Sequence, residues 1–210
     1  MLFNSLLSFM VTIIIYGGPT APGNNFQEKV GGPCEGCEAI YEYGSRTLKA
    51  VDTFPGFKKR PEPIRISGTV YLRDGKTPAK DVILYIYHTD ERGIYPSTSA
   101  SQGWERRHGT IRGWLKTDKN GSYTFYSSRP ASYPNSTIPQ HIHITVKEPG
   151  LNEYYVEDFY FKDDPHITKN ILVRKHPRGG SGVIQLQSEG DLQVAYRNII
   201  LGYNIPNYPD

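Results

Sequence analysis

The sequence predicts an all-β protein, an antiparallel β-sandwich preceded by an irregular N-terminal arm. From residue 64 onward, about eight or nine short apolar or alternating runs are separated by turn signals, with no helix-period pattern between them. The composition agrees, because 16 tyrosines, 21 glycines and 16 prolines among 210 residues suit strands joined by many turns. A chain of this length can bury a proper core in one domain with extensions.

The first element, residues 1–18, is expected to be a secretory signal. Residues 1–16 are largely apolar and are followed by a Gly- and Pro-rich stretch. The run is shorter than the roughly 20 apolar residues of a stable membrane span and is typical of a signal-peptide core. No Lys or Arg precedes it, and no Ala-x-Ala site ends it. We therefore expect export to the periplasm or the extracellular space, with a cytoplasmic protein as the alternative.

Residues 19–62 are expected to form the arm, with one short helix near residues 38–43. This segment is Gly/Pro-rich and poorly periodic, and it holds the only two cysteines, Cys34 and Cys37. A C-x-x-C pair can be a redox pair, half of a zinc site or a local disulfide. Two cysteines exclude a four-cysteine zinc site within one chain, and Gly and Pro on the N-terminal side argue against a thioredoxin-like context. In an exported chain, a short disulfide is favoured.

Residues 63–203 are expected to form the sandwich, and residues 204–210 a loose tail. The expected strands are residues 65–72, 82–88, 113–117, 122–126, the run containing His141 and His143, and residues 154–161, 170–173, 183–186 and 192–201. The run 82–88 is apolar on both faces, which predicts a central strand. The residues Asp118-Lys119-Asn120-Gly121 predict a β-hairpin between the two runs that flank them.

The charge balance argues against a nucleic-acid partner. The chain has 24 Lys and Arg against 21 Asp and Glu, a formal net charge of +3, and no basic run or RNA-binding signature. The sequence leaves the oligomeric state open, with a homo-oligomer as one outcome, and it predicts no stable transmembrane span.

The pair His141 and His143 is the clearest chemical signal. Side chains two residues apart in a strand share one face, so the two imidazoles point the same way and make half of a metal site. Tyr95 and Tyr133 each precede a proline in a predicted loop, where the backbone is biased toward an extended form. Phenolate is a hard anionic ligand that suits Fe(III), and a metal lowers the phenol pKa from its usual ~10. Each feature alone is also compatible with an ordinary polar strand face or a tyrosine-rich chain.

Further motifs fall in one order along the chain. They are Gly68-Thr69-Val70 with Asp74-Gly75 and Pro78, Gly93-Ile94-Tyr95, Arg112-Gly113-Trp114, Thr117-Asp118, Gly121-Ser122-Tyr123-Thr124-Phe125, Arg129-Pro130, Tyr133-Pro134, Pro139-Gln140-His141-Ile142-His143, Tyr160-Phe161, Asp164-Pro165 and Tyr196-Arg197-Asn198-Ile199-Ile200-Leu201. In this order and spacing, the region from Ile66 to Leu201 resembles the intradiol ring-cleavage dioxygenases, such as protocatechuate 3,4-dioxygenase and catechol 1,2-dioxygenase.

The resemblance implies a specific chemistry. Tyr95, Tyr133, His141 and His143 match the four ligands of Fe(III), the cofactor, and the partners would be O2 and a small aromatic diol. The enzyme would cleave a catechol-type ring between its two hydroxyls, adding both oxygen atoms. In such enzymes the substrate displaces one tyrosinate, which can then act as a base, so the two tyrosines are the catalytic candidates.

Two positions depart from the family pattern. The family usually has Arg where this chain has Ile138, and Gln where it has Asp158. Arg112 and Arg129 are the arginines nearest to Ile138 in the sequence. These departures leave open an alternative, a β-sandwich of the same fold that binds iron or aromatics with little or no turnover.

The remaining polar residues receive structural interpretations. His88 ends a core strand and is expected to be structural or pocket-lining. His108 is expected on an exposed loop, with a position bordering the pocket as the alternative, and His166 and His176 are expected on the surface. The run Asp163-Asp164-Pro165 is typical of a turn.

Overall fold

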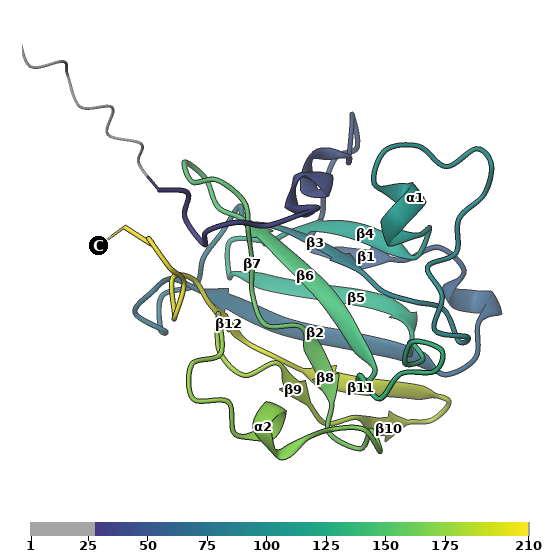
Figure 1. Ribbon diagram of the computed structural model, residues 1–210. Coiled ribbons are helices and arrows are strands. Elements are labelled where there is room, and N and C mark those ends of the chain that lie inside the picture. Colours follow the sequence, from purple (N-terminus) through teal and green to yellow (C-terminus); the bar gives the residue numbers. More distant parts are fainter. Residues whose placement is uncertain (1–27, 210) are drawn as a thin grey trace, which may run out of the picture.

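Two six-stranded sheets pack face to face in this computed structural model, which describes residues 28–209 (Figure 1). The expected signal segment, residues 1–18, lies outside the described residues. The all-β sandwich predicted from the sequence is confirmed, with only short helices between the strands. Nowhere in residues 28–209 is there a helix of the length and apolarity needed to cross a membrane.

The first sheet runs in the order β1-β5-β2-β11-β10, and β12 also pairs with β2. Its strands are β1 (Val51–Thr53), β2 (Pro63–Tyr71), β5 (Ser122–Ser128), β10 (Gln187–Glu189), β11 (Leu192–Tyr196) and β12 (Ile199–Ile200). Along β2, buried and partly exposed residues alternate strictly, as expected of a strand with one face in the core.

The second sheet runs in the order β4-β3-β6-β8-β9, and β7 also pairs with β6. Its strands are β3 (Ile83–Tyr87), β4 (Arg112–Lys116), β6 (His141–Lys147), β7 (Tyr154–Tyr155), β8 (Phe159–Phe161) and β9 (Val183–Ile184). Between the strands lie the helices α1 (Glu105–His108) and α2 (Lys169–Leu172) and the 3-10 helices η1 (Cys37–Tyr41) and η2 (Phe57–Lys59).

The sheets are mixed, which corrects the purely antiparallel arrangement expected from the sequence. The pairs β1–β5, β11–β2, β12–β2 and β8–β9 are parallel. Parallel neighbours need long crossover connections rather than tight turns. The arm and the C-terminal strands reach their partners in this way, from distant parts of the chain.

Two local predictions were wrong. The Asp118 carboxylate accepts hydrogen bonds from the backbone N–H groups of Asn120 and Ser122, so the expected turn forms. It does not close a hairpin, because β4 pairs with β3 in one sheet and β5 pairs with β2 in the other. Residues 170–173, expected as a strand, overlap α2, which is capped by the Thr168 side chain.

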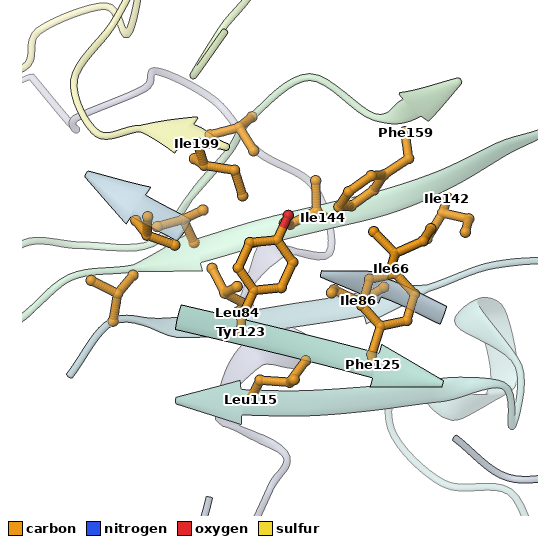
Figure 2. Packing of buried hydrophobic residues seen from close by; sticks show 14 of the residues in the cluster. Ile66, Leu84, Ile86, Leu115, Tyr123, Phe125, Ile142, Ile144, Phe159 and Ile199 are labelled. Atoms are coloured by element: carbon orange, nitrogen blue, oxygen red, sulfur yellow. The ribbon is translucent and has the colours of Figure 1, made fainter. Parts of the chain in front are cut away.

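The central strands of the second sheet are covered on both faces. Leu84 and Ile86 of β3, with Ile142 and Ile144 of β6, point into the core between the sheets (Figure 2). On the outer face, Tyr85 of β3 packs in a second cluster with residues of η1 and β4. This second cover explains why the run 82–88 is apolar on both faces, and it confirms that the strand is central, between β4 and β6.

Candidate metal centre

His141 and His143 lie on the outer face of β6, opposite the core residues Ile142 and Ile144. In the sheet, His143 lies opposite Tyr87 of the neighbouring strand β3. On the other side, Ile142 pairs with Phe159, so the register brings Asp158 next to His143. The strand period therefore fixes the direction of the two imidazoles, and the pairing of three strands fixes what surrounds them.

Tyr95 and Tyr133 lie in two loops that contact each other directly. The buried Asp90 carboxylate accepts two backbone N–H groups of the turn that leads to Tyr95. The backbone carbonyl of Asp90 accepts the N–H of Ala131 from the Tyr133 loop. Gly93 permits the close approach, because it has a φ of +76° and a Cβ there would lie 2.0 Å from a backbone oxygen of the Tyr133 loop.

The four side chains that the sequence singled out converge. Tyr95 Oη lies 2.6 Å from Tyr133 Oη and 2.8 Å from His143 Nε2. Tyr133 Oη lies 3.1 Å from His141 Nε2 and 3.4 Å from His143 Nε2, and the two Nε2 atoms are 3.2 Å apart. Donors bound to one ion at about 2 Å are roughly 2.8–3.3 Å from one another. The observed separations, from 2.6 to 3.4 Å, centre on that spacing.

The protonation of the two imidazoles follows from their other ring nitrogens. His141 Nδ1 lies 2.7 Å from the Pro139 carbonyl oxygen, which can only accept, so Nδ1 carries the hydrogen. His143 Nδ1 lies 3.2 Å from a carboxylate oxygen of Asp158 and is likewise the donor. Both Nε2 atoms therefore face each other and the tyrosine hydroxyls, with Tyr95 Oη 2.8 Å from His143 Nε2 and Tyr133 Oη 3.1 Å from His141 Nε2. This convergence of two imidazole nitrogens and two phenol oxygens is the arrangement of a metal site.

Asp158 contacts His143 on the side of the ring that faces away from the tyrosines. His141, His143 and Asp158 have potential ligand atoms within 4.8 Å of one another, so the three could hold a cation by distance alone. The carboxylate, however, meets His143 at Nδ1, the nitrogen that faces away from the tyrosines. Although burial opposes it, the neighbouring His143 holds the pKa of Asp158 below its usual value. Asp158 therefore remains an ionised acceptor that orients His143. The sequence marks Asp158 as a departure from the family pattern, but it gives no sign of this contact with His143.

Burial sets the electrostatics of the donors. It raises the pKa of Tyr95 and of Tyr133 above the ordinary value for a phenol. It lowers the pKa of His141, which keeps this imidazole neutral. Two phenols of this kind ionise near neutral pH only beside a strong positive charge. The donor set thus fits a highly charged cation, with Tyr95, Tyr133, His141 and His143 as the residues that would hold it.

An aromatic layer supports the site and corrects one prediction. The Tyr87 ring stacks on His143 on one side, at 4.6 Å between centroids, and on His108 on the other, at 3.9 Å. His108 is buried at the end of α1, not on an exposed loop as expected, and its Nδ1 lies 3.0 Å from the Tyr85 hydroxyl. No local sequence signal predicted this, because α1 reaches β3 only in the folded chain.

Arg112 and Arg129, the two basic residues that the sequence pointed to, are already engaged. The Arg129 guanidinium forms two hydrogen bonds with Asp163 and one with Gln140. Arg112 is paired with Glu42 and Glu105. Neither guanidinium is left available as a substitute for the arginine that Ile138 replaces.

The other polar residues have structural contacts. His88 is fully buried, with its two ring nitrogens 2.7 Å from the Thr89 carbonyl oxygen and from the Ser127 hydroxyl. Asp164 accepts the backbone N–H of His166, as expected of turn chemistry, and also that of Gln140, the residue before His141. His166 and His176 are exposed, as predicted.

The two cysteines, Cys34 and Cys37, are joined by a disulfide. The loop that this disulfide closes borders a pocket of about 260 Å³ beside His143. The arm, which the sequence treated as irregular, thus contributes a wall next to the candidate metal centre.

The family model and the solved structures that resemble this chain are all described as dioxygenases. A family model described as dioxygenase matches residues 42–179, well over half of the chain. The dioxygenase domain of a dioxygenase and carbohydrate-binding fusion from Streptomyces sp. SirexAA-E is 21% identical, with a TM-score of 0.54 over 75% of this chain and 94% of that domain. Catechol 1,2-dioxygenase from Acinetobacter sp. ADP1 is 17% identical, with a TM-score of 0.53 over 73% of this chain.

An intradiol ring-cleavage dioxygenase from Tetranychus urticae is 18% identical, with a TM-score of 0.52 over 74% of this chain and 87% of that chain. The match covers only 58% of the Acinetobacter enzyme. At these identities the structural likeness shows the fold, and the family model carries the assignment. This chain belongs to the intradiol ring-cleavage dioxygenase family.

Proposed function

We propose that this protein is a non-haem Fe(III) dioxygenase that uses O2 to cleave a catechol-type ring between its two hydroxyls. Membership of the family supports ring cleavage in general. The single observation that supports the finer statement is the convergence of two phenol oxygens and two imidazole nitrogens, with separations of 2.6–3.4 Å.

The chemistry of this donor set favours ferric iron. Two phenolates are hard, anionic ligands and two imidazoles are neutral ones, so the set offsets two of the three charges of Fe(III). Soft metals would prefer thiolate, and the two cysteines are joined in the disulfide. When bound, Fe(III) would act as a Lewis acid and as a template that holds the two substrate oxygens.

The residues of the chain have separate tasks in this proposal. Pro139 and Asp158 orient His141 and His143 through their Nδ1 atoms, so the Nε2 lone pairs are directed at the metal before it binds. In this proposal Tyr133 Oη is the group that moves away and accepts a proton from a substrate hydroxyl; like Tyr95, Tyr133 lies on a loop rather than on a strand. Tyr95 would stay in place, because the Asp90 carboxylate accepts two hydrogen bonds from the turn that leads to it, whereas the Tyr133 loop donates one to the Asp90 backbone carbonyl.

The test is spectroscopic and kinetic. Protein loaded with Fe(III) should absorb visible light through charge transfer from tyrosinate to iron, and it should consume O2 with a catechol. Tyr133→Phe should weaken and shift the band and lower O2 consumption, while Tyr126→Phe, on the other sheet, should leave both unchanged. A folded protein that binds no iron would rule out the proposal. Bound iron without O2 consumption over a panel of catechols would favour the alternative, a binding module with little turnover.

A further inference from the structure

Arg197, which follows β11, is a buried cation that the metal centre described above does not use. Its side chain is only 4% exposed, and none of its three guanidinium nitrogens forms a hydrogen bond with a residue of the described chain. A guanidinium keeps its positive charge in proteins, and a buried charge without hydrogen-bond partners is costly. The core of the sandwich therefore holds a fixed positive charge that packing alone does not explain.

The backbone of Arg197 is fixed by the first sheet. Its N–H donates to the Ser67 carbonyl of β2, and its own carbonyl accepts the Tyr123 hydroxyl at 2.8 Å. Gly68 permits this arrangement, because a Cβ there would lie 1.7 Å from the Arg197 carbonyl oxygen. Three separate contacts thus hold the start of the side chain in one place.

The guanidinium reaches across the core to the second sheet. Its Cζ atom lies 4.5 Å from the centre of the Phe159 ring, a distance typical of a cation–π contact. Phe159 of β8 pairs with Ile142 of β6, the core residue between the two candidate histidine ligands (Figure 2). Phe159 also follows directly after Asp158, whose carboxylate contacts His143. The positive charge therefore lies on the core side of the sheet whose outer face carries the metal centre.

The charges around this position balance in pairs. Two acidic residues, Glu157 and Asp158, are neighbours in the connection between β7 and β8. The Glu157 carboxylate pairs with Arg174, and the Asp158 carboxylate meets His143. Burial lowers the pKa of Arg197, whereas Asp158 and Glu157 act in the opposite direction, so these charges are near enough to interact. With Arg174 engaged by Glu157, Arg197 is the cation that remains to offset Asp158.

This offset matters for iron because the two oxidation states differ by one unit of charge. A negative charge near the metal favours Fe(III) over Fe(II), and a positive charge has the opposite effect. The ionised Asp158 alone would shift the centre toward Fe(III), and a cation on the core side limits that shift. The same balance sets how strongly bound Fe(III) acts as a Lewis acid on a substrate.

We propose, on the basis of the proposed function, that Arg197 is the fixed counter-charge of the metal centre: it offsets Asp158 and so limits the preference of the centre for Fe(III) over Fe(II). Arg197 touches neither substrate nor metal and acts through the core. A role restricted to filling the core beside Phe159 would leave this preference unchanged.

The test replaces Arg197 with Met, which removes the charge, and with Lys, which keeps it. Urea unfolding of the metal-free proteins first establishes that each variant folds. The ratio of the binding constants for Fe(III) and Fe(II) is then obtained from the midpoint potential of the bound iron. Arg197→Met should raise this ratio by about tenfold and move the visible band to shorter wavelength, whereas Arg197→Lys should stay within about threefold of the wild type.

A second substitution tests the partner charge. Asp158→Asn should lower the ratio, and the double variant with Arg197→Met should lie between the two single variants, because the two changes act in opposite directions. If Arg197→Met alone does not fold, the double variant is compared with Asp158→Asn instead. The double variant buries neither charge, and it should still have the higher ratio of the two.

Arg65→Met is the matched control. It removes the same charge from β2, where Arg65 pairs with Glu189 at the surface, and it should leave the ratio within about twofold of the wild type. An unchanged ratio in Arg197→Met, an equal change in Arg65→Met, or an Arg197→Lys variant that behaves like Arg197→Met would overturn the counter-charge while leaving ring cleavage intact. If the wild type binds no iron, the proposed function fails first, and the inference fails with it.

Discussion

Two tyrosine–histidine clusters lie side by side on the outer face of the second sheet. The metal cluster consists of Tyr95, Tyr133, His141 and His143. The stacking cluster consists of Tyr85, Tyr87, Trp104 and His108. The residue types are nearly the same, and the Tyr87 ring touches a histidine of each cluster.

The clusters differ in which polar atoms remain available. In the metal cluster, both Nδ1 atoms are hydrogen-bonded outward, to Pro139 and Asp158, and both Nε2 atoms face inward. In the stacking cluster, His108 Nδ1 meets the Tyr85 hydroxyl and its ring lies flat on Tyr87. Orientation by the supporting residues, rather than residue type, distinguishes the metal site from aromatic packing.

The sharpest test of this comparison replaces one histidine from each cluster. His143→Ala should lower iron affinity by more than the roughly 10–100-fold that loss of a supporting residue costs, because it removes a ligand. His108→Ala should retain iron but lower the free energy of unfolding by about 2–4 kcal/mol, because it leaves a cavity among buried rings. Metal content after dialysis and urea unfolding measure the two effects. Equal iron loss in both variants would break the comparison.

The stacking cluster should also depend on pH. Burial lowers the pKa of His108 to about 4, from 6.5 in an unfolded chain. The folded state therefore needs the neutral ring, so its contribution is fully present above pH 6.5 and is lost progressively as the pH falls toward 4. The loss amounts to about 3 kcal/mol at most. Urea unfolding between pH 7.5 and 4.5 should show that the free energy of unfolding of the wild type falls relative to that of His108→Phe as the pH is lowered. Parallel curves would contradict it.

The next effect concerns Asp158. Asp158→Ala removes the acceptor for His143 Nδ1, and we expect iron affinity to fall roughly 10–100-fold. Asp158→Asn keeps an oxygen acceptor and should recover part of this loss. Competition with a chelator measures both. If alanine and asparagine variants bind iron like the wild type, His143 does not depend on this contact.

The smallest effect should come from Tyr87→Phe. The ring stacking on His143 and His108 is retained, so we expect iron affinity within about twofold of wild type and a change in unfolding free energy below about 1 kcal/mol. Tyr87→Leu, which removes the ring from both clusters, should have a clearly larger effect on each. A phenylalanine variant as damaged as the leucine variant would show that the hydroxyl, and not the ring, links the clusters.

Local sequence signals predicted much of the fold. A short run bounded by turn signals identified β2, and the doubly apolar run 82–88 identified β3 as a central strand. The same signals failed where pairing is non-local. The Asp118 turn reverses the chain as expected, but the following strand β5 joins the other sheet. Ile171, Leu172 and Val173 are β-branched or apolar, yet the segment forms α2 and its cap with no buried residue in the helix, so no strand partner imposes an extended form.

The sequence by itself determined that His141 and His143 share one face, because a strand has a period of two and the intervening Ile142 belongs to the core. The Tyr-Pro loop context suggested Tyr95 and Tyr133, and the resemblance to a family then matched all four residues to metal ligands. Only the tertiary structure decided that all four donors meet, that Asp158 and Tyr87 flank His143, and that the arm with its disulfide walls the pocket. These contacts join residues far apart along the chain. Their positions depend on which strands pair and in what register, and no local propensity specifies that.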